Sequence, residues 1–173
     1  MERVLVVGAT GAGKSTLAHA LGSRLGLPYH EMDALYFNGP GWAVNDRLVE
    51  DVARVTAGPR WIIDSLGHPE VRDLLWGRAD TVIWLDYTRR VIMPRVLRRS
   101  VRRTVTREVV FGGNRETWVG WLSREHPVWW SWSQHRTRRR DIALRLRDPR
   151  FASLETRRFG RPQDTAAWLA SVR

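Results

Sequence analysis

The sequence predicts an α/β protein in which a five-stranded parallel sheet lies between two layers of helices, a three-layer α/β/α arrangement. Three observations carry this prediction. Apolar runs of strand length alternate with helical stretches along the chain, as they do where crossover helices join parallel strands. A glycine-rich turn connects the first strand to the first helix. Three strands are followed by an aspartate, at the sheet edge where α/β proteins bind ligands.

The strands are predicted from apolar runs bounded by turn residues. The first run, Val4-Leu5-Val6-Val7, is continuous and apolar, as expected for a parallel strand that is buried on both faces. The runs around Ile62 and Ile83 have the same character. We therefore expect strands at residues 3–7, 29–32, 60–64, 81–86 and 151–159.

The helices are predicted from their start and stop residues. The first helix ends at Gly26, and Gly58-Pro59 stops a helix for which Asn45 is the expected N-cap. Thr88 is expected to cap a long basic helix that is kinked near Pro94. We expect helices at residues 14–25, 45–57, 69–76, 88–104, 127–147 and 162–172.

Two segments lack regular periodicity. Residues 36–42 contain Gly39-Pro40-Gly41 and are expected to form a loop. Residues 105–125 contain Gly112-Gly113-Asn114 and are expected to form a mobile loop or lid. Because no repeat or interdomain linker is visible, we expect residues 1–173 to form a single domain that carries this lid.

The turn after the first strand matches the phosphate-binding pattern G-x-x-x-x-G-K-[ST] without a mismatch. Glycines at positions 8, 11 and 13 let the loop fold tightly and point backbone N–H groups at an anion. The positive end of the following helix adds to the same field. The chain is therefore expected to be a P-loop NTPase with ATP and Mg²⁺ as cofactors, bound through Gly11, Ala12, Gly13, Lys14, Ser15 and Thr16, with the Ser15 hydroxyl as a metal ligand.

Lys14 is the only lysine among 29 basic residues. One explanation of the arginine bias is base composition. The bias breaks, however, at the one position where a compact ammonium group must fit inside a phosphate-binding loop.

Composition narrows the function classes. The 173 residues include no cysteine, which excludes disulfides and thiolate metal sites, and no run is long and apolar enough to span a membrane. We expect a cytoplasmic protein.

The net charge of +11 is concentrated in residues 89–158, which hold 19 arginines and 6 acidic residues. This half of the chain is expected to meet an anionic partner, either a polyphosphate or a nucleic acid.

Three aspartates at strand ends are candidate site residues. Asp64 is expected to support the metal, and the alternative is that it caps a helix. Asp33 is expected to orient or deprotonate an acceptor hydroxyl, and the alternative is a loop aspartate bonded to nearby N–H groups. Asp86 is equally compatible with capping the helix after Thr88.

The basic helix supplies candidate phosphate ligands. Arg95 and Arg99 are four residues apart and share one helix face, from which they can close on the γ-phosphoryl group. Arg98 and Arg102 form a second pair on a neighbouring face. The alternative is a solvated basic surface. One or two arginines of the group Arg136, Arg138, Arg139 and Arg140 are candidates to complete the phosphate contacts.

Histidine and tryptophan carry less information. His30 and His68 lack metal-ligand spacing, so no structural metal is expected. The 10 tryptophans include Trp118, Trp121, Trp129, Trp130 and Trp132. We expect these to anchor the lid and the following helix to the core, and the alternative is base stacking beside arginines in a nucleic-acid groove.

These residues give the chain a resemblance to the adenylate-kinase-like branch of P-loop kinases, and most of all to its small topology-modulation (FlaR-like) proteins. The resemblance implies an acceptor-site role for Asp33, a role for Asp64 in the Mg²⁺ shell, and a phosphate grip by Arg95 and Arg99. It also implies that the loop Phe159-Gly160-Arg161-Pro162 lies against adenine, so that Arg161 and Pro162 contact the nucleotide.

The resemblance departs at two positions. Adenylate kinases hold the monophosphate with an arginine three residues after the acceptor-site aspartate and another four residues after the third-strand aspartate. This chain has Tyr36 and His68 there, which argues against AMP held in the usual way. We expect the acceptor to lie between Asp33, Tyr36, Trp42 and His68.

The leading hypothesis is a kinase that moves the γ-phosphoryl group of ATP·Mg²⁺ to a nucleotide or a small hydroxyl-bearing acceptor, with Lys14, Asp33, Arg95 and Arg99 as its catalytic residues. The alternative is a P-loop ATPase or regulator that binds nucleic acid through residues 89–158.

Overall fold

The computed structural model describes residues 1–124 and 126–172. Its centre is a parallel sheet of five strands in the order β2-β5-β1-β6-β7, as the sequence predicts. The strands are β1 (Arg3–Gly8), β2 (Tyr29–His30), β5 (Trp61–Ile63), β6 (Thr81–Leu85) and β7 (Glu155–Phe159).

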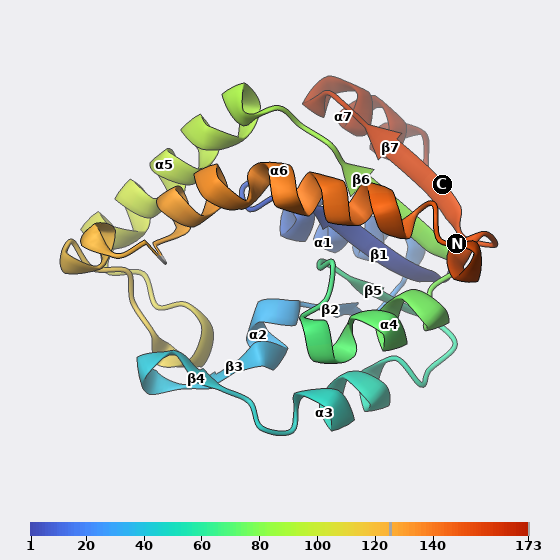
Figure 1. The fold of residues 1–173 in the computed structure, drawn as a ribbon, viewed down its shortest axis with the longest axis horizontal. Helices are drawn as coiled ribbons and strands as arrows, with labels where there is room; N and C mark the ends of the chain where they lie inside the picture. Colours follow the sequence, from blue (N-terminus) through green and yellow to red (C-terminus); the bar gives the residue numbers. More distant parts are fainter. Residues whose placement is uncertain (125, 173) are drawn as a thin grey trace.

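Helices cover both faces of the sheet. In Figure 1, α6 crosses in front of the sheet and α1 lies behind it. Side chains alternate along β1, so that Leu5 and Val7 pack with one layer and Val4 and Val6 with the other. The first layer consists of α3 (Leu48–Val55), α4 (Pro69–Arg78) and α6 (Pro127–Arg145), and the second of α1 (Lys14–Leu25), α5 (Arg89–Thr106) and α7 (Pro162–Ser171).

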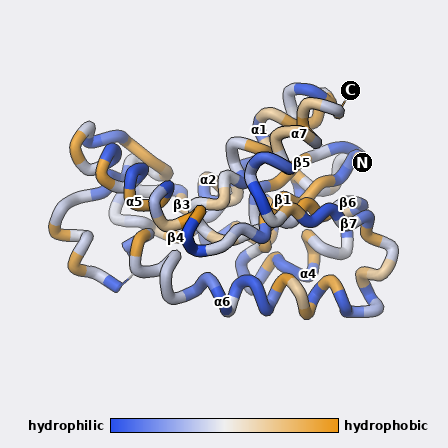
Figure 2. The backbone as a smooth tube through the Cα atoms, turned by 90° about the horizontal axis from the view of Figure 1, so that it is seen from above, coloured by the Kyte–Doolittle hydropathy of each residue, from blue (hydrophilic) through white to orange (hydrophobic). Residues whose placement is uncertain are grey.

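The apolar core follows from these two layers. The four residues Val4, Leu5, Val6 and Val7 are fully buried, and β1 is coloured as hydrophobic in Figure 2. Burial of such side chains stabilises the fold by roughly 1.5–3 kcal/mol each. The central strand and the loop that leaves it are therefore among the most firmly held parts of the molecule.

The second predicted strand is shorter than expected. Strand β2 ends at His30, and a helical turn, α2 (Met32–Tyr36), follows at once. Asp33 therefore lies in the first turn of α2 and not at a strand end, which corrects the prediction. The cause is a long-range contact, because Asp64 Oδ1 accepts a hydrogen bond from Met32 N at 3.1 Å and so holds the helix start.

The predicted loop over residues 36–42 is also more regular than expected. It contains β3 (Phe37–Gly39) and a 3₁₀ turn at Pro40–Trp42, and β3 pairs in antiparallel fashion with β4 (Ala43–Val44). We call residues 36–44 the hairpin. Glycine at position 41, with φ of +69°, allows the tight turn.

Three further boundaries differ from the prediction. Helix α3 begins at Leu48, and Asn45 is not its N-cap but accepts a hydrogen bond from Arg47 N at 3.0 Å in a local turn. Strand β7 begins at Glu155, because a 3₁₀ turn at Pro149–Phe151 occupies the start of the predicted strand. Thr88 stands at the N-cap position of α5, but its side chain makes no capping hydrogen bond.

The predicted lid connects α5 to α6 and contains two 3₁₀ turns, Phe111–Gly113 and Val119–Leu122. Figure 1 shows this segment descending from the far end of α5 to the hairpin and returning to α6. Asn114 joins the two segments, since its Nδ2 donates to Gly39 O at 3.0 Å and its Oδ1 accepts from Trp42 N at 2.9 Å. The lid is thus docked on the hairpin.

Among the described residues, no helix has the length and apolar character needed to cross a membrane.

Candidate functional site

The P-loop has the geometry that its sequence predicts. Gly8 and Gly11 have φ of +151° and +84°, and a Cβ on Gly11 would lie 2.2 Å from Val96 Cγ2. Gly13 occupies the N-cap position of α1 with φ of +92°. Only glycine fits these conformations without strain. The backbone N–H groups at the start of α1 are therefore free of side-chain caps and face the sheet edge.

Lys14 lies folded against the loop. Its Nζ donates a hydrogen bond to Ala9 O at 3.3 Å. Burial lowers the pKa of Lys14, and the negative charges of Asp64 and Asp33 oppose this shift. The amine therefore sits in a desolvated position between the phosphate loop and two carboxylates, where an incoming phosphate would restore a negative partner.

Two arginines of α5, Arg95 and Arg99, lie near the P-loop. Arg95 Nη1 lies 3.5 Å from Ala12 O, and its guanidinium stands over the Tyr87 ring at 5.7 Å. Arg99 is half-buried, and its buried Nε has no hydrogen-bond partner. Burial, then the charge of Arg103, lowers the pKa of Arg99, while Glu116 and Asp33 oppose the shift. A half-buried guanidinium with an unused donor is suited to binding an anion.

The charge of Asp33 interacts with side chains from four elements. Its charge acts on Lys14 of α1, on Arg99 of α5, on His68 at the start of α4 and on Arg138 of α6. The Asp33 side chain is exposed. The structure thus brings this predicted acceptor residue to the P-loop even though it lies on a helix.

Asp64, the residue expected to support the metal, lies near Lys14 of the P-loop. It is buried, and Tyr29 Oη donates to its Oδ2 at 3.1 Å. Tyr29 also interacts with Ser15, and burial followed by the negative charge of Asp64 raises the pKa of Tyr29. The protonated tyrosine therefore links the carboxylate to the Ser15 hydroxyl.

The residues present fit a magnesium ion bound together with a nucleotide. Ser15 offers a hydroxyl at the start of α1, and Asp64 keeps lone pairs beyond the two that accept from Tyr29 and Met32. Among the described residues, no group of three or more His, Cys, Asp or Glu side chains forms a cage of its own. Magnesium that is held partly by phosphate oxygens and water needs no such cage.

The expected acceptor residues form one wall. The rings of Tyr36 and His68 are parallel, with centroids 3.6 Å apart, and Phe37 meets Tyr36 edge-on at 4.8 Å. Trp42 packs edge-on against Phe37 at 5.3 Å. Burial lowers the pKa of His68. The wall is therefore aromatic, and its imidazole is neutral near pH 7.

Asp86 is held by two arginines. It is buried and accepts hydrogen bonds from Arg139 Nε at 2.7 Å and Arg158 Nε at 2.9 Å. These contacts tie α6 and β7 to the end of β6. Long-range ion pairs thus hold this carboxylate, for which the sequence suggested a site role or a capping role.

The residues of the expected adenine loop come directly after the last strand. Arg161 and Pro162 follow β7, and Phe159 stands in register with Leu85, which in turn is in register with Gly8. The expected adenine loop thus lies at the same sheet edge as the P-loop. Ser131 of α6 donates to Thr10 O at 3.0 Å, so that α6 also borders this edge.

The tryptophans of the lid and of α6 contradict the packing prediction. Trp118, Trp129 and Trp132 are 60%, 54% and 53% exposed. Trp121 is the exception, since its Nε1 donates to Thr104 Oγ1 at 3.0 Å and anchors the lid to α5. The core is filled instead by Trp61, Trp76 and Trp84.

Sequence reasoning did not single out Tyr29, which donates to Asp64, or Arg72, whose charge acts on His68. No sequence pattern identifies Tyr29. Arg72 stands in the first turns of α4, where the helix dipole disfavours a cation, and this was an available signal.

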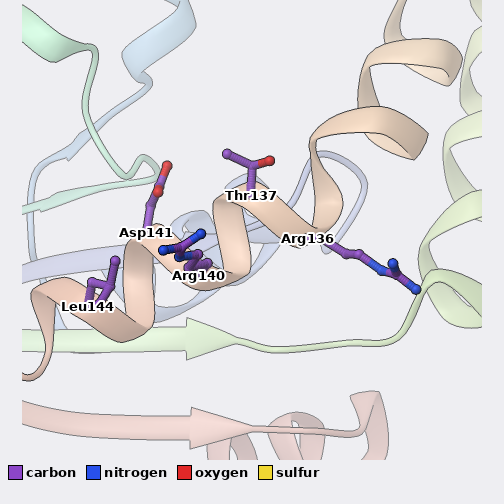
Figure 3. Close-up of a pocket in the computed structure, with 5 residues that line it drawn as sticks. All are labelled: Arg136, Thr137, Arg140, Asp141 and Leu144. Atoms are coloured by element: carbon purple, nitrogen blue, oxygen red, sulfur yellow. The ribbon is translucent and has the colours of Figure 1, made fainter.

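A surface hollow on α6 is separate from this site. Figure 3 shows the five residues that line it, Arg136, Thr137, Arg140, Asp141 and Leu144. Four of them are exposed. Two of the arginines considered for phosphate contacts, Arg136 and Arg140, line this hollow, whereas none of the residues expected at the P-loop or at the acceptor wall does.

Comparison with protein-family models and with curated proteins gave no match. Among solved structures, the chain is similar to an unliganded sugar kinase from Janibacter sp. HTCC2649, with a TM-score of 0.53 and 19% identity over 99% of this chain and 94% of that one. It is also similar to a shikimate kinase from Acinetobacter baumannii in complex with shikimate, with a TM-score of 0.55 and 15% identity over 99% of this chain and 90% of that one. These likenesses establish the fold.

Proposed function

We propose that this protein, which has the P-loop NTPase fold, is an ATP-dependent phosphotransferase that acts on a hydroxyl-bearing small molecule or nucleotide. One observation carries the proposal. Lys14 and Arg99, on separate helices, both lie close enough to Asp33 for their charges to interact with its carboxylate. Phosphoryl transfer needs positive charge around the γ-phosphate and a carboxylate that accepts the hydroxyl proton, and this cluster supplies both.

The nucleotide side would be formed by the P-loop. Backbone N–H groups at residues 11–16 would bind the β- and γ-phosphates, and Lys14 would turn from Ala9 O to the phosphate oxygens. Arg95 and Arg99 would neutralise charge on the transferring group. Ser15 and Asp64 would hold magnesium, which when bound supplies charge neutralisation at the phosphates.

The acceptor side would be formed by Asp33 and the aromatic wall. The acceptor hydroxyl oxygen would attack the γ-phosphorus as the bond from that phosphorus to the β,γ-bridging oxygen breaks, and its proton would pass to Asp33. ADP is the leaving group. The stacked rings of Tyr36 and His68 would exclude water from one side of the acceptor.

The placement within P-loop kinases is part of the proposal. The order of Asp33, Asp64, Arg95 and Arg99 along the chain supports the adenylate-kinase-like branch. The Tyr36–His68 stack supports an acceptor other than AMP held by two arginines.

The test is ADP production from ATP and Mg²⁺ with and without candidate acceptors, which include nucleoside monophosphates, polyols, sugars and their acids and phosphates. An acceptor-dependent rise that Lys14→Ala and Asp33→Asn remove supports the proposal. ATP turnover that no acceptor changes contradicts it.

A second candidate function is binding of single-stranded nucleic acid, and the exposed tryptophans favour it. Trp129, Trp132 and Arg136 follow one another on α6 at helical spacing, and the Arg89 guanidinium lies over the Trp132 ring at 4.6 Å. Exposed aromatic rings beside arginines are suited to stacking on bases. Binding to a random-sequence oligonucleotide should then fall steeply with salt, and Trp132→Ala should weaken it. Affinity that is absent at low salt excludes this candidate.

A further inference from the structure

One face of α6 is directed at the sheet edge. Ser131, His135 and Ile142 are buried and recur at helical spacing. Ser131 Oγ contacts Thr10 O at 3.0 Å, His135 Nε2 contacts Tyr87 O at 2.9 Å, and Ile142 packs in the core. Arg138 lies between His135 and Ile142 on this face and is half-buried. Arg138 therefore stands on the face of α6 that is turned toward the sheet edge, and not on its exposed face.

A second arginine approaches from α4. Arg72 Nε donates to Gly67 O at 3.0 Å, which holds its side chain beside His68. Helices α4 and α6 lie side by side here, because Arg145 of α6 pairs with Asp73, the residue after Arg72, at 2.6 Å. The positive charge of Arg72 also adds to burial in lowering the pKa of Arg138. Both charges also act on His68. The two guanidinium groups thus share one region next to the aromatic wall.

Neither arginine has an acidic side chain bound to it. Among residues 1–124 and 126–172, no ion pair or side-chain hydrogen bond joins Arg72 or Arg138 to a carboxylate. Asp33 and Asp141 attract Arg138 only at longer range. Two neighbouring, partly desolvated guanidinium groups are unfavourable until an anion lies between them.

The nucleotide does not account for this pair. Lys14 and Arg95 contact the P-loop itself, through Ala9 and Ala12. Arg72 is held instead at Gly67, beyond the P-loop and next to the acceptor wall. Asp33 lies between the two groups of cations, because its charge acts on Lys14 as well as on Arg138.

We propose that Arg72 and Arg138 form a binding site for an oxyanion that the acceptor carries, so that the substrate is an anionic hydroxy compound held with its hydroxyl at Asp33. The inference rests on the proposed phosphotransferase function and adds the chemical class of its acceptor. The anion can be a carboxylate or a phosphate, since paired guanidinium groups bind either one.

The site is tested first without catalysis. With the P-loop filled by magnesium and a non-hydrolysable ATP analogue, orthophosphate and gluconate are titrated separately by calorimetry. We expect at least one of them to bind, and Arg72→Gln and Arg138→Gln each to weaken binding by about tenfold. Glutamine keeps an amide donor for Gly67 O at position 72.

Arg140→Gln is the matched control. It removes an arginine from the same helix only two residues from Arg138, but from the exposed side that Figure 3 shows. This variant should bind like the original protein. No binding of either anion at about 10 mM, or equal binding by all variants, overturns the proposal.

Measurements of ADP production then distinguish a failure of this inference from a failure of the proposed function. Neutral and anionic acceptors are compared in pairs, glycerol with glycerol 3-phosphate and glucose with gluconate. The anionic member should raise ADP production, and Arg72→Gln and Arg138→Gln should raise its KM by about tenfold with the KM for ATP nearly unchanged. If the anions bind at Arg72 and Arg138 but no acceptor is phosphorylated, the proposed kinase function is wrong and the proposed anion site stands. If neutral acceptors are phosphorylated and neither substitution changes the rate, the proposed anion site is wrong and the kinase function stands.

Discussion

The imidazole of His68 lies parallel to the phenol ring of Tyr36, with the ring centroids 3.6 Å apart. These two residues occupy the positions at which the resemblance to adenylate kinases would place two arginines. Their stacked rings form a flat aromatic surface at the place where the two arginines would bind an anion. The positive charges of Arg72 on α4 and Arg138 on α6 act on His68. The proposed acceptor side therefore combines an aromatic surface with arginines at positions other than those that the resemblance implies.

Lys14 should be irreplaceable, even by arginine. Its compact amine fits against Ala9 O, whereas a planar guanidinium is larger and carries its donors in a fixed fork. Lys14→Ala and Lys14→Arg should each lower kcat for acceptor-dependent ADP release by roughly a hundredfold or more. Equal thermal stability of the three proteins without nucleotide serves as the folding control. Substantial activity of Lys14→Arg would contradict the assigned fit.

Arg99 should act on the transferring phosphoryl group. Arg99→Gln removes a half-buried guanidinium whose Nε has no partner, so the variant should lose roughly a hundredfold in kcat and gain stability or remain unchanged. Arg98→Gln alters the neighbouring, exposed arginine of the same helix and is the control. Similar losses in both variants would show that the effect comes from the net charge of α5.

The nucleotide half of the site could be predicted because its determinants are local. Gly8, Gly11, Gly13 and Lys14 lie within a few residues of each other, and the conformation that each glycine adopts is encoded in its missing side chain. The five strands could be predicted for a related reason, since continuous apolar runs have few alternatives to a buried parallel strand.

The acceptor half depends on contacts between distant residues, and these were not predictable. Asp33 lies on a helix and not at the predicted strand end, because Asp64, 31 residues later in the sequence, accepts a hydrogen bond from Met32 N. Asn114 joins the lid to Gly39 across 75 residues. Local propensity carries no information on such pairs. Asp86 was ambiguous for the same reason, as its partners Arg139 and Arg158 lie on other elements.

Gly112 should be required for docking of the lid on the hairpin. A Cβ at this position would lie 2.5 Å from Gly39 O, whereas a Cβ on Gly113 meets nothing within 4 Å, although both residues have positive φ. Gly112→Ala should therefore separate the lid from the hairpin, and Gly113→Ala should cost only about 1 kcal/mol of backbone strain. Tryptic cleavage after Arg107 and Arg115 measures the difference. Equal cleavage rates of the two variants would argue against the docking contact.

Asp86 should matter for stability and not for nucleotide binding. Asp86→Asn leaves Arg139 and Arg158 without their anionic partner, and because both arginines are about half exposed, the free energy of unfolding should fall by about 2 kcal/mol. Urea unfolding measures this loss, and calorimetry with ATP should show an unchanged affinity. A large loss of ATP affinity would show that Asp86 does contribute to nucleotide binding.

Stability should fall as the pH falls below about 7, in part because of His126. This histidine is buried, its Nδ1 accepts from Val128 N at the start of α6, and burial lowers its pKa while Glu116 opposes the shift. The unfolded chain, with a histidine pKa of about 6.5, then binds the proton more strongly than the folded one, so protonation favours unfolding below that pH. His126→Asn keeps a capping side chain and should make the unfolding free energy less dependent on pH between about 5 and 7. His19→Asn, at an exposed position of α1, is the control. If His126→Asn and the original protein have the same dependence of unfolding free energy on pH, His126 does not cause the loss of stability.

The solitary lysine has a practical consequence. Apart from the α-amino group, the chain offers an acylating reagent only one aliphatic amine, and the burial that lowers its pKa leaves more of it as the reactive free base at neutral pH. A single covalent adduct, counted by mass spectrometry, would therefore report occupancy of the phosphate cradle directly. Any compound that shields this amine from labelling can be recognised in a mixture before its chemistry is known.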